Sequence, residues 1–232
     1  MQMNGGYLVN MVLIENMVQL DLTGPYEVLA RVPGWTVELV AVSRNPVRTD
    51  RGLTIVPTVT RDLAAKPNLF VLPGGAGIDD AMADPEWVRF TRDQAEAADH
   101  VFGICTGAFL LAAAGLLIGR RAGAHWQARD LLSKFGATPC DDRMVQDGKF
   151  YTSGGVTSGI DMALKVVADL AGVETAQKIQ LAMEYDPAPP FPGGTPFTSP
   201  RAIVEALQAH GASRRERREK LTDQVSASML RG

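Results

Sequence analysis

The sequence has few cysteines and histidines, the residues that most often staple small domains or hold metals. It contains two cysteines, Cys105 and Cys140, and three histidines among 232 residues. Two cysteines allow at most one disulfide, and a chain of this length can bury a sufficient core without one. No CxxC or HxxxH spacing is present, so no metal site is expected. This composition favours a reducing, cytoplasmic setting.

Neither sign of charge dominates the chain. The 23 Lys and Arg and the 26 Asp and Glu give a net charge of −3, so a nucleic-acid-binding surface is not expected. No Lys or Arg precedes Arg31, so the apolar run 7–14 lacks the positive flank of a secretory signal and is predicted to be a core strand. The charge-free stretch 101–119 is interrupted by Gly103 and Gly107. Those glycines favour a strand, a turn and a buried helix over a membrane span.

Strand-like and helix-like segments alternate along the chain, which predicts an α/β fold. Alternation of this kind is typical of a doubly wound, mostly parallel sheet with helices on both faces. Ligands of such sheets bind beyond the carboxyl ends of the strands. We therefore expect the active site where the glycine-rich loop 74–77 meets Cys105. The predicted strands cover residues 7–14, 36–43, 69–72 and 101–104, with hairpins at 47–57 and 143–152; the predicted helices begin near Thr23 and cover 84–98, 107–117, 126–135, 158–171 and 174–185.

The last third of the chain differs in composition from the rest. Residues 186–200 are rich in proline and predict an ordered, irregular arm across a surface or partner. A further helix is expected from Ser199-Pro200 to about His210-Gly211. The charge run 213–220 then predicts a solvated or frayed helix without assigned function. The expected organisation is one domain over residues 1–211, including the arm, followed by a charged tail at 212–232.

Cys105 is the residue whose surroundings say most about chemistry. A short apolar strand precedes it, and Thr106-Gly107 and a helix follow, which is the layout of a nucleophile elbow. The sulfur would face a helix amino end, where the dipole and backbone N–H groups favour the reactive thiolate. A small buried core residue fits the same local pattern equally well. Cys140 adjoins two carboxylates, which disfavour a thiolate, and is expected to be structural.

Three further groups near the predicted site have both a plain and a catalytic interpretation. Asp21 is most simply a turn or capping residue, but a partly buried carboxyl with a raised pKa could shuttle a proton. Loop 74–77 lacks the lysine of a phosphate-binding loop. Its amides could form an anion hole together with the Thr106 amide, or its glycines could be required only by the backbone geometry of the turn. His125 could be the base of a Cys-His dyad or an ordinary histidine.

Six motifs along the chain belong together. They are LDLTGP at 20–25, LFVLPGG at 69–75, GICTGA at 103–108, AHW at 124–126, TSGGVTSGID at 152–161 and EYDPAPPF at 184–191. Taken together they resemble those of the DJ-1/PfpI superfamily, over roughly residues 8–207. Within the superfamily, an aspartate at position 21 and the proline-rich arm resemble the isocyanide hydratase branch. Glu15 departs from the pattern, because it replaces an aromatic-proline turn and adds a charge near the expected pocket rim.

The resemblance implies a flavodoxin-like fold, a catalytic role for particular residues and a homodimer. Cys105 would be the nucleophile and Asp21 the acid/base, while the amides of Gly75 and Thr106 would receive developing negative charge. His125 is a secondary candidate. The implied reaction converts an organic isocyanide to an N-substituted formamide without a metal or organic cofactor. The expected partners are a small-molecule substrate and a second copy of the chain, with no nucleic acid and no membrane.

Other activities share the same nucleophile and stay open at this point. A glyoxalase-like enzyme acting on a reactive carbonyl is the main enzymatic alternative, although aspartate instead of glutamate at position 21 argues against it. A non-enzymatic redox sensor could use oxidation of Cys105. A ligand-sensing transcription regulator is disfavoured, because too few residues follow His210 for a helix-turn-helix domain. A glutamine amidotransferase would need a late histidine followed closely by glutamate, which His210-Gly211 does not supply.

Overall fold

The fold is given by a computed structural model that describes residues 6–229. Strands and helices alternate, as the sequence predicts. The strands are β1 (Tyr7–Val12), β2 (Trp35–Ala41), β3 (Val47–Arg48), β4 (Thr54–Ile55), β5 (Val59–Thr60), β6 (Leu69–Leu72), β7 (His100–Ile104), β8 (Arg121–Ala122), β9 (Thr138–Pro139), β10 (Met144–Asp147) and β11 (Phe150–Ser153). The helices are α1 (Gln19–Leu29), α2 (Gly77–Ala81), α3 (Pro85–Ala97), α4 (Ala108–Ala113), α5 (Ser158–Ala171), α6 (Val173–Ala182) and α7 (Arg201–Met229), with 3₁₀ turns η1 (Cys105–Gly107) and η2 (Arg129–Phe135).

A seven-stranded sheet runs through the centre of the molecule. Its order is β10-β11-β7-β6-β1-β2-β5. All neighbouring strands are parallel except β10 and β11, which form the antiparallel hairpin predicted around Asp147-Gly148. The central strand β6 is buried along its whole length, as its unbroken apolar sequence requires. The mostly parallel α/β sheet is therefore confirmed.

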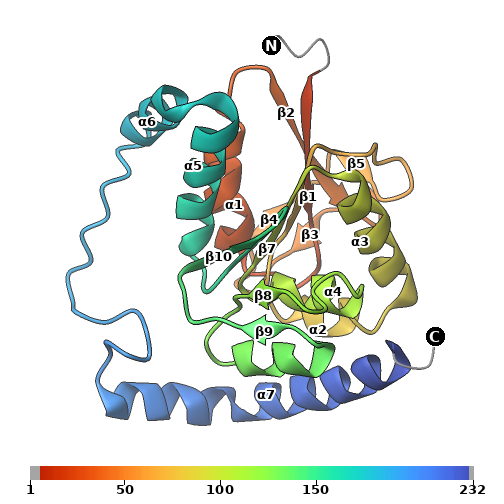
Figure 1. The fold of residues 1–232 in the computed structure, drawn as a ribbon, viewed down its shortest axis with the longest axis vertical. Helices are drawn as coiled ribbons and strands as arrows, with labels where there is room; N and C mark the ends of the chain where they lie inside the picture. Colours follow the sequence, from red (N-terminus) through yellow and green to blue (C-terminus); the bar gives the residue numbers. More distant parts are fainter. Residues whose placement is uncertain (1–5, 230–232) are drawn as a thin grey trace.

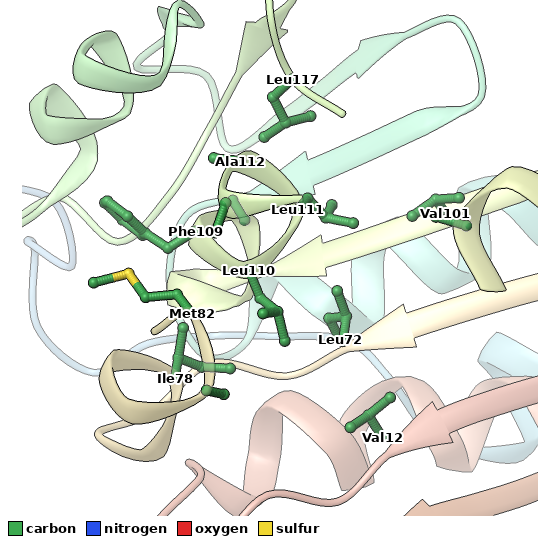
Figure 2. Close-up of a cluster of buried hydrophobic side chains, with 14 of the residues drawn as sticks. Val12, Leu72, Ile78, Met82, Val101, Phe109, Leu110, Leu111, Ala112 and Leu117 are labelled. Carbon is green, nitrogen blue, oxygen red and sulfur yellow. The ribbon is translucent and has the colours of Figure 1, made fainter. Parts of the chain in front are cut away.

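Helices cover both faces of this sheet (Figure 1). Helices α1, α5 and α6 lie over one face, and α2, α3 and α4 lie over the other. Figure 2 shows the second layer: Phe109, Leu110 and Leu111 of α4 lie among Ile78 and side chains from the strands. The chain between β7 and α4 is therefore held inside the core. Within residues 6–229 no helix has the length and apolar run that a membrane crossing needs.

Several predicted helix boundaries are confirmed and others are wrong. Helix α3 begins where predicted, since Asp84 Oδ1 accepts the Glu86 N–H at 2.8 Å and Pro85 occupies the first position. Helix α1 begins at Gln19 rather than Thr23, so Asp21 lies in its first turn instead of before it. The helix after Cys105 is shorter than predicted, ending at Ala113. The segment near 126–135 is a 3₁₀ helix that ends at Gly136 with φ of +77°.

The C-terminal segment departs furthest from its prediction. Helix α7 continues through Gly211 to Met229, so the predicted end near His210-Gly211 is wrong. The prediction that this tail is solvated or frayed is also wrong, because Arg218 and Thr222 are buried. The helix runs along the end of the domain, beside η2 and α4 (Figure 1). The arm 186–200 is irregular as predicted, and its Phe191 and Phe197 side chains are exposed.

Candidate active site

The glycine-rich loop after β6 and the turn after β7 meet at the carboxyl edge of the sheet. Strands β6 and β7 are parallel neighbours, so the segments that follow them leave the sheet side by side. The Gly75 N–H donates to Thr106 Oγ1 at 2.9 Å, and that hydroxyl donates to the Gly75 carbonyl at 3.2 Å. The predicted meeting of loop 74–77 with Cys105 is confirmed.

Cys105 occupies a strained turn between β7 and α4. Its φ of +56° lies in the left-handed region, which is uncommon for a residue with a side chain. The following turn fits only glycine, because a Cβ on Gly107 would lie 2.4 Å from the Leu72 carbonyl oxygen. This strand, strained turn and helix have the geometry of a nucleophile elbow.

The buried carboxyl of Asp21 lies against Cys105. Asp21 has no exposed surface, and its Oδ2 accepts the Gly74 N–H at 2.9 Å. The carboxyl and the Cys105 thiol lie close enough to shift each other's pKa. Asp21 Oδ1 has no partner among residues 6–229. A Cβ on Gly74 would lie 2.8 Å from Asp21 Oδ2 and 2.5 Å from the Thr106 nitrogen, so glycine is needed for this approach.

Burial governs the protonation of both groups. Burial raises the pKa of Asp21 to about 7, although the Gly74 N–H and Cys105 oppose the rise. Burial, and then the charge of Asp21, raise the pKa of Cys105 well above its usual value, while the Thr106 N–H and Arg218 act in the opposite direction. The Thr106 N–H at the helix end lowers the pKa of Cys105 in the predicted direction, but burial and Asp21 outweigh it. The two groups share protons as a coupled pair.

The two amides predicted to receive negative charge, those of Gly75 and Thr106, have different partners. The Gly75 N–H is taken up by Thr106 Oγ1, as described above. The Thr106 N–H faces the Cys105 sulfur, where it lowers the pKa of the thiol. The Thr106 amide is thus the better placed of the two to meet negative charge at the reacting sulfur and carbon.

His125 lies at the same cavity but is not bonded to the Cys105 thiol in the hydrogen bonds of the described residues. Its backbone N–H donates to the Cys105 carbonyl at 3.3 Å, and its Nδ1 accepts the Gln127 N–H at 3.4 Å. Burial and the charges of nearby arginines lower the pKa of His125 to about 4. The ring is therefore neutral near pH 7, and a dyad with Cys105 stays a prediction.

The cavity above Cys105 has a volume of about 430 Å³. The sheet side contributes Gly75, Cys105 and Thr106, and α7 contributes Gly211, Arg214, Arg215 and Arg218. Sequence reasoning missed the α7 residues. Hydrophobic periodicity gave little signal for them, because the residues that α7 turns toward the protein are Gly211, Arg215, Arg218, Thr222, Val225 and Met229.

Cys140 and metal ligation are separate from this cavity. Cys140 is free, does not line the cavity, and lies with its sulfur 3.4 Å from Arg121 Nε. Across residues 6–229 no three His, Cys, Asp or Glu side chains gather as metal ligands would. The chemistry that this site itself offers is a buried thiol, a carboxyl of raised pKa and a backbone amide.

Comparison with known proteins fits this architecture. Residues 8–169 match the model of the DJ-1/PfpI family. The chain belongs to the DJ-1/PfpI family. It is similar to an isonitrile hydratase of Pseudomonas putida, with 43% identity over 95% of this chain and 97% of that protein. A crystal structure of a THiJ/PfpI family protein from Pseudomonas syringae superposes with a TM-score of 0.90 and 36% identity, covering 96% of this chain and 91% of that one.

A second kind of relative has a different activity. The glutathione-independent glyoxalase DJR-1.2 of Caenorhabditis elegans is 28% identical over 70% of this chain and 86% of that protein. The family therefore includes proteins named for the hydration of isonitriles and proteins named as glyoxalases.

Proposed function

We propose that this protein hydrates an organic isocyanide to an N-substituted formamide, with Cys105 as nucleophile and Asp21 as acid and base. The observation that carries the proposal is the buried carboxyl of Asp21, held by the Gly74 N–H beside the thiol of a strained elbow. The 43% identity to an isonitrile hydratase over nearly the whole chain supports this substrate class. The enzyme is a hydro-lyase whose steps below need no cofactor.

In the first step the proton of the coupled pair goes to the substrate. Asp21 takes the Cys105 proton, and the sulfur attacks the terminal carbon of the isocyanide. Asp21 returns the proton to that carbon, so the carbon gains one bond to sulfur and one to hydrogen. The product is a thioimidate on Cys105, and Asp21 is left ionised. The Thr106 N–H stabilises the sulfur while it carries negative charge.

In the second step water completes the formamide. Ionised Asp21 removes a proton from water, whose oxygen adds to the thioimidate carbon, and the proton passes to the nitrogen. The tetrahedral species then collapses as its hydroxyl proton goes to Asp21 and the carbon–sulfur bond breaks. The formamide leaves, and the thiolate and protonated carboxyl regenerate the pair. One water is consumed and no electrons are exchanged with an external partner.

The test is to incubate the purified protein with an aryl isocyanide and follow formamide formation by ultraviolet absorbance and mass spectrometry. Turnover that depends on Cys105 is the expected result. The same protein should be offered methylglyoxal, because the nematode relative is named a glyoxalase. Lactate formation without isocyanide turnover would replace the proposal by the glyoxalase-like activity. Reversible oxidation of Cys105 without either turnover would replace it by redox sensing.

We also propose that the protein is a cytoplasmic homodimer. Support for a second copy comes from the arm 186–200, whose Phe191 and Phe197 side chains are 80% and 72% exposed. Support for the compartment comes from the two free cysteines. Sedimentation at micromolar concentration tests the dimer, and a monomer there would contradict it.

A further inference from the structure

Helix α7 brings two arginines of one face into the wall of the Cys105 cavity. Arg214 and Arg218 are one helical turn apart and both line the cavity. Neither takes part in the steps proposed for Cys105 and Asp21. Their presence in a cavity that binds a small molecule needs its own explanation.

Arg218 is buried with an unused hydrogen-bond donor. Its side chain is 6% exposed, and its Nε donates to Asp79 Oδ1 of α2 at 2.5 Å. Its Nη2 is buried and has no acceptor among the described residues. An unpaired N–H on a buried guanidinium is unfavourable. A well-packed apolar side chain would hold α7 against the domain with about the same stability as this buried ion pair. Asp79 Oδ2 is also buried and has no hydrogen-bond partner among residues 6–229, and Arg218 Cζ lies 5.7 Å from the centroid of the Phe109 ring. Because Arg218 lines the cavity and keeps a donor that no described residue accepts, it offers a charged partner to an acceptor that enters the cavity.

The carboxylates near these arginines leave one positive charge in excess. Arg215 is paired with Asp130 and also donates to the Gln127 carbonyl. Arg214 and Arg218 share the single carboxylate of Asp79, because Asp79 Oδ2 lies 3.8 Å from Arg214 Nε and Asp79 Oδ1 pairs with Arg218. Asp50 also lines the cavity, where its charge acts to raise the pKa of Arg214, and it faces Arg51 at 3.5 Å.

Burial and the charge of Arg218 lower the pKa of Arg214, in accord with this crowding of positive charge. The Asp21 and Cys105 pair carries one negative charge when it holds one proton, and that charge belongs to the reacting centre rather than to the α7 ion pairs. The excess of one matches a monoanion such as a carboxylate better than a dianion.

We propose that Arg214 and Arg218 form a carboxylate subsite, so that the preferred substrate is an isocyanide bearing a carboxylate. The isocyano carbon lies at Cys105 and the carboxylate accepts hydrogen bonds from Arg218 Nη2 and from Arg214. The proposal rests on the proposed function for the reaction, and the subsite itself can be measured without turnover.

The first experiment compares para-isocyanobenzoate with its neutral methyl ester. The intact protein should show a kcat/KM for the carboxylate on the order of tenfold above that for the ester. In Arg214→Gln this ratio should fall to about one. The matched control is Arg217→Gln on the same helix, whose exposed side chain pairs with Asp80 outside the cavity, and it should keep the ratio. Equal ratios in the intact protein and Arg214→Gln would overturn the subsite.

Arg218 needs a gentler substitution, because Arg218→Gln leaves Asp79 buried without its main partner and can release α7. Arg218→Lys keeps a charge for Asp79 and removes the forked N–H groups. We expect its carboxylate-to-ester ratio to lie between those of the intact protein and Arg214→Gln. An unchanged ratio would remove Arg218 from the subsite.

The second experiment separates the subsite from the reaction. Benzoate should slow the alkylation of Cys105 by iodoacetamide, followed on the Cys105 peptide by mass spectrometry, and benzamide should protect less. In Arg214→Gln the two should protect equally. Protection by benzoate without turnover of any isocyanide would reject the proposed function and keep the subsite. Turnover of the ester with no preference for the carboxylate and no protection by benzoate would keep the function and reject the subsite.

Discussion

One wall of the Cys105 cavity is made by backbone turns of the sheet, and another is made by side chains of α7. The sheet wall consists of Gly75, Cys105 and Thr106, with Gly74 next to Gly75 in the chain, and the α7 wall includes Gly211, Arg214 and Arg218. In the sheet wall, backbone atoms come so close that a Cβ on Gly74 would lie 2.5 Å from the Thr106 nitrogen. In the α7 wall, a Cβ on Gly211 would meet only the Gln127 side chain, at 3.2 Å.

The difference separates two properties of the cavity: the sheet wall positions the reacting groups, and the α7 wall carries the charge. Backbone contacts fix the sheet wall rigidly, as the placement of a nucleophile against its acid requires. The α7 wall is held by ion pairs to α2 and η2, and substitutions there change charge without moving the elbow. We therefore expect changes in the sheet wall to act on turnover, and changes in the α7 wall to act on stability and selectivity.

The largest effect is expected for Cys105→Ala, which removes the nucleophile of the sheet wall. Turnover of an aryl isocyanide should fall by at least about 10³-fold, because no other group can form the thioimidate. The control is Cys140→Ala, the other free cysteine, which lies outside the cavity and should retain activity. Formamide formation measures both, and comparable turnover in Cys105→Ala would contradict the assignment of the nucleophile.

Asp21→Asn should separate turnover from stability. Loss of the acid and base should lower kcat by about 10²–10⁴-fold. Burial raises the pKa of Asp21 from 3.8 to about 7, so stability is lost as the pH rises from about 4 to about 7, where the carboxyl ionises in the unfolded state but keeps its proton in the folded state. The variant should therefore unfold with a free energy about 2–4 kcal/mol higher than the intact protein at about pH 8.

This gain in the free energy of unfolding should vanish by about pH 4, where Asp21 is protonated in the intact protein. Urea titrations at the two pH values measure it. In the intact protein kcat/KM should rise with pH through about 7, because the pair then goes from two protons to the single proton that the first step uses. A profile that is flat through pH 7, or a variant that is less stable at high pH, would show that Asp21 is not the buried titrating group.

Asp79→Asn tests the attachment of the α7 wall. It removes the charge that faces buried Arg218, and the free energy of unfolding should fall by about 3 kcal/mol. Trypsin should then cut within α7 faster than in the intact protein. Asp80→Asn is the matched control, because the Asp80 pair with Arg217 is exposed and contributes less than about 1 kcal/mol. Similar losses in the two variants would mean that burial does not distinguish the two ion pairs.

The smallest effect is expected for Gly211→Ala, which tests the continuity of α7. Alanine in the middle of a helix is favoured over glycine by up to about 1 kcal/mol, and the Gln127 side chain must shift to admit the methyl group. A small gain in thermal stability is expected. A clear loss would indicate that the helix ends at Gly211 in solution, as the sequence alone suggests.

Local patterns in the sequence were enough to predict the sheet, the elbow and the place of Cys105 on it. The reason is that these features depend on residues close together in the chain: the apolar run of β6 and its glycines, and the apolar run of β7 followed by Cys105, Thr106 and Gly107. Such local patterns specify a strand and the turn after it. The site-residue roles of Cys105 and Asp21 stay proposals, but their meeting at one edge of the sheet followed from parallel strand order.

The protonation of the Asp21 and Cys105 pair and the burial of the α7 face depend on tertiary contacts. The pKa of a group depends on burial by elements far away in the chain, which outweighs the local helix end at Cys105. The inward face of α7 consists largely of Gly, Arg and Thr, so hydrophobic periodicity does not reveal that it is buried. Arg218 meets Asp79 across 139 residues of chain, and no local pattern encodes such a contact.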